Sequence, residues 1–331
     1  MNINQMKSAI AKFRKADLSV VKDSNLRAKG QKLQGKEKGF TLLELLVVIT
    51  LIAILATGAL IAYEDVGESA EAASAGNAAS TIDRAIRTYR AVENAYPNQW
   101  DNLVDAAGAE LTFTAPVMGS FLAAWTPGVS GDGGKGDEMI EMFEESGIEE
   151  LQQVNAAATL GDVAPNRFHN ESSGDSEEVE IEDGDLPARF AVVPNDNCQG
   201  TGAAAVLTDY PAAAFDGTAA TSNNLQNAYG DALEGDECHV LVALGFGGDA
   251  AASTTFSNVA IAQSPTYVRN TGDEDTSVNP EINYSRYIGL FQAGEYDLEA
   301  DSMEWNDKLR LIAIVSTDGK NIDQLNSEAQ Q

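Results

Sequence analysis

The sequence predicts an α+β fold in which a long N-terminal α-helix packs on a C-terminal antiparallel β-sheet. Residues 40–63 form the longest apolar run of the chain, and residues 82–92 place apolar side chains three and four positions apart, as an amphipathic helix does. Segments with the composition of strands come later, separated by Gly, Asn, Asp and Pro: 189–193, 204–207, 239–244, 258–262 and 309–315. Strands that follow one early helix as a group favour α+β.

The ends of the helical segments can also be predicted. The long helix should end before Tyr96, because Pro97 disfavours a helical conformation at the residue that precedes it. A second helix is predicted over residues 137–154, after the glycine-rich stretch 128–136. Residues 171–185 are rich in acids and poor in apolar side chains, which indicates a surface loop.

Charge divides the chain into two pieces. Residues 1–39 hold 10 of the 21 Lys and Arg side chains but only three of the 51 acids. The remaining 292 residues therefore carry 11 basic and 48 acidic side chains, a net charge of -37. A body this acidic repels phosphate backbones, which excludes ordinary nucleic-acid binding by the main domain.

Residues 40–63 have the length of a membrane span. As a helix they would be about 36 Å long, enough to cross a bilayer. Lys and Arg precede the run and acids follow it, so we expect a single-pass inner-membrane anchor with a cytoplasmic N-terminus and the acidic body outside. An uncleaved signal anchor and a secretory signal peptide are the alternatives, although the apolar core of a secretory signal peptide is shorter, roughly 7 to 15 residues.

Cys198 and Cys238 are the two cysteines of the chain. Both fall on the side of the membrane where disulfides form, so we predict that they pair. Closing the loop between them would stabilise the fold by roughly 4 kcal/mol in the chain-entropy model. Two free buried thiols are the alternative.

Glu44 is the one charged residue of the apolar run. A carboxylate in hydrocarbon needs a partner, and residues 40–63 contain no Lys or Arg. A cut between Gly39 and Phe40 would supply one, because it creates an α-amino group on Phe40. That amine would lie one helical turn from Glu44 of the same chain, or beside Glu44 of a neighbouring subunit.

The residues around this junction carry a resemblance to a known family. The segment KGFTLLE, from Lys38 to Glu44, followed by LLVVITLIAILA, resembles the N-terminal signature of type IV prepilins and type II secretion pseudopilins. The resemblance implies a type IV pilin-like fold. It also implies that prepilin peptidase cleaves after Gly39 and N-methylates Phe40, and that Glu44 registers each subunit during assembly.

The resemblance also implies an organisation and a set of partners. Residues 1–39 would be a basic leader that is cleaved, 40–63 the transmembrane and polymerisation helix, 64–95 its amphipathic continuation, and 96–331 the acidic globular head. Partners would be further copies of the chain in a helical filament, prepilin peptidase, an inner-membrane assembly platform and the membrane. The assembled filament would be periplasmic or extracellular.

Catalytic chemistry is not indicated by the sequence. His169 and His239 are the two histidines, neither belongs to a recognisable Ser-His or Cys-His arrangement, and both are interpreted as structural or solvated. Near the C-terminus, Ser316, Asp318 and Asp323 surround a Gly turn, and the loop resembles the calcium-binding Ser-x-Asp-Gly-Lys loop of major type II pseudopilins. A plain Asp-Gly turn is the alternative.

The leading hypothesis is therefore a non-enzymatic structural subunit of a type IV pilus or of a type II secretion filament. Adhesion, twitching motility, DNA uptake and secretion all use subunits with this N-terminus. The apolar run has no mid-helix Pro, which tilts the choice toward a pseudopilin or an atypical pilin. The alternatives are a membrane-tethered periplasmic module that binds calcium or a protein and never polymerises, and a tethered enzyme.

Overall fold

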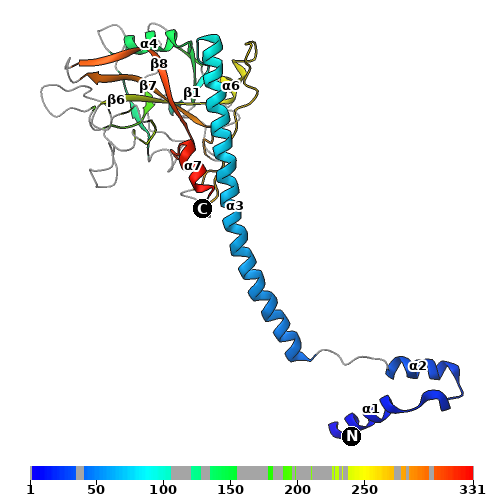
Figure 1. Cartoon of the computed structure of the whole chain (residues 1–331). Helices are drawn as coiled ribbons and strands as arrows, with labels where there is room; N and C mark the ends of the chain where they lie inside the picture. Colours follow the sequence, from blue (N-terminus) through cyan, green and yellow to red (C-terminus); the bar gives the residue numbers. More distant parts are fainter. Residues whose placement is uncertain are drawn as a thin grey trace. The chain divides into compact units, whose positions relative to one another are not determined.

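The computed structural model describes residues 2–34, 41–105, 121–127, 135–154, 178–181, 189–195, 198, 210, 226, 228–230, 233, 238–271, 277–280, 283–297 and 302–330 (Figure 1). Two compact units make up the chain, Met1–Tyr63 and Glu64–Gln331.

The first unit begins with short helices in the basic segment. These are α1 (Ile3–Lys15), the 3-10 helix η1 (Leu18–Val20) and α2 (Ser24–Gln34). The side chain of Gln34 donates hydrogen bonds to the carbonyl oxygens of Phe13 and Ala16, at 2.7 and 2.8 Å. These two bonds tie the end of α2 to the end of α1.

Helix α3 (Leu42–Glu93) is 52 residues long and belongs to both units. It ends where the sequence predicts. Asn94 follows with a φ of 57°, a left-handed conformation that Asn tolerates and that commonly closes a helix. Pro97 then prevents the helix from resuming.

The second unit contains an eight-stranded sheet. Its strands are β1 (Trp100–Asp105), β2 (Ala123–Trp125), β3 (Glu150–Val154), β4 (Glu178–Glu180), β5 (Phe190–Val192), β6 (His239–Gly245), β7 (Ile288–Asp297) and β8 (Ser302–Val315). The order is β2-β5-β6-β1-β3-β4, and β7 pairs with both β6 and β8. The β1–β3 pair is parallel and the other pairs are antiparallel. The predicted mixture of helix and antiparallel sheet is confirmed, with one parallel pair added.

Helix α3 packs on one face of this sheet (Figure 1). Its buried stripe recurs at three- and four-residue spacing: Ala75, Ala79, Ile82 and Ile86. The stripe shares a core with Trp100, Phe246 and Phe291, whose rings meet edge to face at 5.1 Å. Successive residues of β6 alternate between this core and a second one on the opposite face, as a central strand requires.

The predicted strands 189–193 and 239–244 coincide with β5 and β6, and the one at 309–315 covers the second half of β8. The segment 204–207 lies outside the described residues. The strand predicted at 258–262 is wrong, because these residues form bends and irregular chain after helix α6 (Gly248–Ala252). There the N–H of Asn258 donates to Glu93 of α3 and the N–H of Ile261 donates to Thr254, so the backbone is satisfied without a partner strand.

The helix predicted at 137–154 is wrong in its second half. Helix α4 spans Lys135–Glu145, and β3 occupies the remainder. Gly147, at a φ of 78°, turns the chain out of the helix. The side chain of Asn98 then accepts the N–H groups of Glu149 and Glu150 and leads the segment into pairing with β1. Strand β4 falls within the predicted acidic loop and pairs with β3.

Packing of α3 on the sheet should contribute strongly to stability. We expect Ile86→Ala, at a fully buried position, to lower the free energy of unfolding by roughly 2–4 kcal/mol, because it removes apolar contact and leaves a cavity. Val92→Ala is the matched control, since Val92 is half exposed on the same helix. Urea denaturation of the full-length chain in detergent measures both, and equal losses would contradict the packing described here.

Candidate functional site

The junction of Gly39 and Phe40 lies outside the described residues, so cleavage and methylation there stay predictions. Description resumes at Thr41, immediately before the first residue of α3.

Glu44 forms a capping box with Thr41. The N–H of Thr41 donates to the Glu44 carboxylate at 2.9 Å, and the Thr41 hydroxyl donates to the same oxygen at 2.8 Å. In return the N–H of Glu44 donates to the Thr41 hydroxyl at 3.2 Å. The T-x-x-E pattern of a capping box is visible in the sequence, so the hydrogen bonds of Glu44, as well as its charge, could be predicted from it.

The first turns of α3 present an apolar surface. Residues Leu42–Leu60 form a helix long and apolar enough to cross a membrane, and none of that window is buried inside the structure. Leu42, Ile54 and Leu60 are each more than two-thirds exposed. A helix that is apolar all round needs lipid or other helices as its surroundings.

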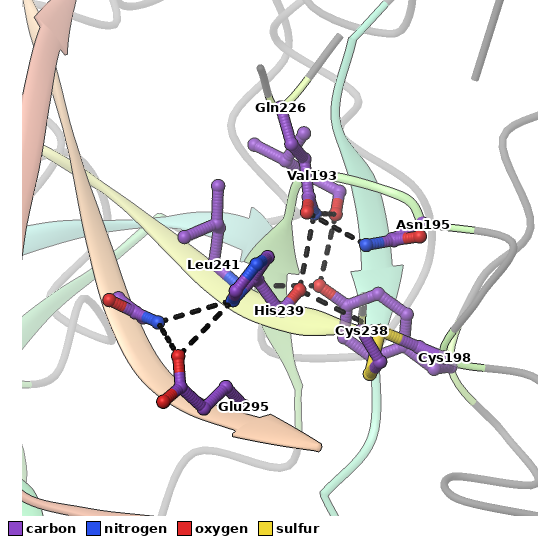
Figure 2. Close-up of a disulfide and its surroundings, with 10 residues drawn as sticks. Val193, Asn195, Cys198, Gln226, Cys238, His239, Leu241 and Glu295 are labelled. Carbon is purple, nitrogen blue, oxygen red and sulfur yellow. Dashed lines mark hydrogen bonds and ion pairs between the residues drawn. A yellow bond between two sulfur atoms is a disulfide. The ribbon is translucent and has the colours of Figure 1, made fainter. Parts of the chain in front are cut away.

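The predicted disulfide is present and joins Cys198 to Cys238 at the start of β6 (Figure 2). The two Cα atoms are 4.6 Å apart, and both residues are buried. The side chain of Gln226 donates to the carbonyl oxygens of Val193 and His239, which binds the chain beside the disulfide to both β5 and β6. The disulfide therefore links the chain that follows β5 to the start of β6, two strands that pair in the sheet.

His239, the first residue of β6, is buried beside the disulfide (Figure 2). Its Nδ1 atom lies 3.3 Å from the amide nitrogen of Gln292 and 3.6 Å from a carboxylate oxygen of Glu295. These contacts are those of a packed strand residue, as predicted. His169 lies outside the described residues.

The C-terminal loop is organised around Asp318, whose side chain is 3% exposed. One carboxylate oxygen accepts hydrogen bonds from Tyr267 at 2.9 Å and from Arg269 at 2.8 Å, and the other accepts one from Ser316. The ammonium of Lys320 lies 3.4 Å from the first oxygen. Burial raises the pKa of the Tyr267 phenol, and the Asp318 charge raises it further, so Tyr267 keeps the proton that it donates.

These contacts do not fit a calcium site. Both oxygens of Asp318 already accept hydrogen bonds, and Arg269 and Lys320 supply positive charge where a divalent cation would supply it. Asp323 is exposed in the first turn of α7 (Ile322–Glu328), where a negative charge favours the helix. Within the described part of the chain, His, Cys, Asp and Glu form no group of three that could hold a metal. The contacts of Asp318 therefore argue against the calcium site expected at Ser316, Asp318 and Asp323, and a direct measurement of calcium binding decides the question.

Arg269 and Tyr267 were not among the residues that the sequence singled out. They lie about fifty positions before Asp318, so no local pattern links them to it. The signal that could have found Arg269 is its rarity, because it is one of 11 bases among residues 40–331. A buried carboxylate in so acidic a chain must find one of them.

Removing the disulfide should destabilise the second unit. For a loop of 40 residues we expect Cys198→Ser with Cys238→Ser to lower the free energy of unfolding by roughly 4 kcal/mol. Thermal unfolding of the full-length chain before and after reduction measures this. If reduction left the melting temperature of the wild-type chain unchanged, the disulfide would not carry this role.

The Asp318 loop gives a test of calcium binding. We expect thermal unfolding of the wild-type chain to be the same in calcium and in chelator, because Arg269 and Lys320 neutralise the carboxylate. Arg269→Ala should cost roughly 2–3 kcal/mol by leaving Asp318 poorly paired, and Arg269→Lys should cost less. A calcium-dependent rise in melting temperature that Asp318→Asn abolishes would establish the metal site instead.

Comparison with known proteins isolates the N-terminal segment. The family model of the prokaryotic N-terminal methylation motif matches residues 34–60. No curated protein and no solved structure matches the chain. The matched residues include the junction at Gly39, the capping box of Thr41 and Glu44, and the apolar surface of α3. The chain carries the prepilin-type methylation motif that is found in type IV pilins and pseudopilins.

Proposed function

We propose that the chain is a structural subunit of a type IV pilus or of the pilus-like filament of type II secretion. The observation that carries the proposal is the methylation motif, placed where an exposed apolar helix begins. In this proposal the precursor spans the inner membrane with its N-terminus in the cytoplasm, prepilin peptidase cleaves after Gly39, and Phe40 is N-methylated. The mature chain then joins a filament through the apolar half of α3.

The physical logic of assembly supports the proposal. The apolar half of α3 needs a non-aqueous environment, which lipid provides before assembly and neighbouring helices provide after it. The second unit has cores of its own on both faces of its sheet, so the apolar half of α3 is not needed to fold it. This division of labour suits a subunit that carries a folded head on a polymerising helix.

A membrane-tethered module that never polymerises is the alternative. It would use the same apolar helix as an anchor and would keep residues 1–39 attached. Intact mass and N-terminal sequencing of the protein from its native membrane separate the two. We expect a chain that begins at Phe40 and carries one added methyl group. A chain that retains residues 1–39 would overturn the proposal.

The capping box allows the role of the Glu44 charge to be tested separately from its role in starting the helix. Glu44→Gln keeps a side chain that can close the capping box but removes the charge, whereas Thr41→Val removes the cap and keeps the charge. If the charge pairs with the Phe40 amine of a neighbour, Glu44→Gln should abolish filaments while Thr41→Val reduces them only modestly.

The measurement is the yield of sheared filaments, with Leu45→Met as a control for a conservative change in the same turn. N-terminal sequencing of each variant shows whether cleavage still occurs. Normal filament yield from a cleaved Glu44→Gln chain would show that the charge is dispensable. It would leave the helix cap as the function of this residue.

A further inference from the structure

The C-terminal end of α3 carries a small basic recess in an otherwise acidic body. A pocket of about 330 Å³ is lined by Arg87, Arg90, Ala91, Asn94, Tyr96 and Leu311, and we call it the arginine socket. Residues 40–331 hold 11 basic side chains against 48 acidic ones. Two of the 11 line this recess, so the socket is a local reversal of the charge of the chain.

Contacts hold both socket arginines in place. Arg87 binds the Asp83 carboxylate at 2.9 Å and donates to the carbonyl oxygen of Ile312 at 3.1 Å, yet its side chain remains 49% exposed. The Arg90 guanidinium lies 4.6 Å from the centre of the Tyr96 ring and donates to the Tyr96 hydroxyl. Fixed guanidinium groups lose little side-chain entropy when they bind a carboxylate.

A third arginine adds to the field of the socket. Burial raises the pKa of Tyr96 above its ordinary value, and the charges of Arg90, Arg87 and Arg310 partly oppose that rise. Arg310 is an exposed residue of β8, beside the buried Leu311 that lines the socket. Three arginines around one recess, with one of them paired to Asp83, leave an excess of positive charge there.

Two acids with the same spacing lie nearer the N-terminus of the same helix. Glu68 and Glu71 are exposed and separated by three positions, the same spacing as Arg87 and Arg90. Residues three apart on a helix are neighbours on its surface, so each pair presents two charges side by side. The N–H of Asn270 donates to the Glu71 carboxylate at 3.2 Å, which helps to fix that side chain.

One displacement brings both pairs into register. Glu68 precedes Arg87, and Glu71 precedes Arg90, by the same 19 positions. Shifting one copy of α3 along the axis of another by about 28 Å therefore brings both glutamates to the height of both arginines. Nineteen residues are five turns and about 100° more, so the second copy must also be rotated about its axis for the two pairs to face each other. The apolar segment lies at the N-terminal end of α3 in every copy. The two copies must run parallel for these segments to share one non-aqueous environment.

We propose that the arginine socket receives Glu68 and Glu71 of a second copy of the chain, displaced along the helix axis in a parallel stack. This contact is head to tail, so every copy offers one socket and one acidic pair, and the array stays open and extends as a filament. Charge complementarity favours a second copy of the chain as the partner, because the basic arginine socket of one copy would contact the acidic surface of another. The contact also offsets part of the repulsion between acidic bodies. This inference rests on the proposed filament function.

Charge exchange in the full-length chain tests the pairing. We expect Arg87→Glu with Arg90→Glu to lower the yield of sheared filaments at least about tenfold, because like charges would then face each other across the contact. Adding Glu68→Arg and Glu71→Arg to the same chain should restore filaments, since the pairs are re-formed with opposite polarity. Normal yield from the arginine variant, or no recovery in the exchanged chain, would overturn the inference.

Cysteine cross-linking tests the register without depending on the charge variants. Cells that make one copy with Glu68→Cys and another with Arg87→Cys should give disulfide-linked dimers in the filaments. Glu68→Cys with Thr88→Cys is the matched control, because Thr88 is exposed on a different side of the same helix. Equal cross-linking of both pairs would overturn the inference.

The two proposals fail in different ways. If the wild-type chain is cleaved and forms filaments that ignore these changes, the pairing is wrong and the filament function stands. If the wild-type chain keeps residues 1–39 and makes no filaments, the proposed function itself is wrong.

Discussion

The burial of one stripe of α3 against the sheet is the contact on which the rest of the second unit depends. Ala75 and Ala79 have short side chains, so the helix can approach the sheet closely, and Ile82 and Ile86 then fill the space above them. Where the helix lies closest, the Tyr287 hydroxyl donates to the carbonyl oxygen of Ala75 at 3.0 Å. Such a bond to a helix carbonyl fixes the position of α3 along the sheet as well as its distance from it.

Helix α7 packs beside α3 at this contact. A Cβ atom added at Gly76 would lie 2.5 Å from Oδ1 of Asn326 in α7, so a larger residue there would displace the Asn326 side chain. Helix α7 follows directly from the Asp318 loop, and Lys320 of that loop pairs with Glu328 at the end of α7. Asp318, the two cations that pair with it and helix α7 are therefore linked to one another, and α7 packs beside α3.

The sequence predicts this architecture where the determinants are local. The extent of α3 follows from its apolar run, its periodicity and Pro97, and β5, β6 and β8 follow from runs of β-branched and other apolar residues. Strand β7 was missed because its glycines weaken the strand pattern. The neighbours of Gly289 are Trp100 and Phe291, and those of Gly294 are residues of β8, so both positions need a residue without a side chain.

What could not be predicted depends on partners far apart in the chain. The helix predicted at 137–154 ends at Glu145, where Gly147 turns the chain, and the strand that replaces its second half depends on Asn98, some fifty residues earlier, which accepts the N–H groups of Glu149 and Glu150. Asp318 looked like a calcium ligand because its local neighbours are oxygen donors, and Arg269 lies outside any window that a motif covers. Pairing between distant segments is a property of the fold. A local sequence pattern can therefore suggest that oxygen atoms bind a ligand without showing which distant residue they contact instead.

The charges along α3 are distributed unevenly between its apolar part and the part that packs on the sheet. From Leu42 to Leu60 the one charge is Glu44, whose carboxylate closes a capping box, so the helix can begin in an apolar setting without an unsatisfied backbone N–H at Thr41. Beyond that segment the charges return in two groups: acids alone from Glu64 to Glu71, and then three arginines, flanked by Asp83 and Glu93, near the end of the helix. A rod with this order repels an unshifted parallel copy of itself and attracts a shifted one. In the proposed filament, pairing of Glu68 and Glu71 with Arg87 and Arg90 would favour a staggered stack over a side-by-side pair.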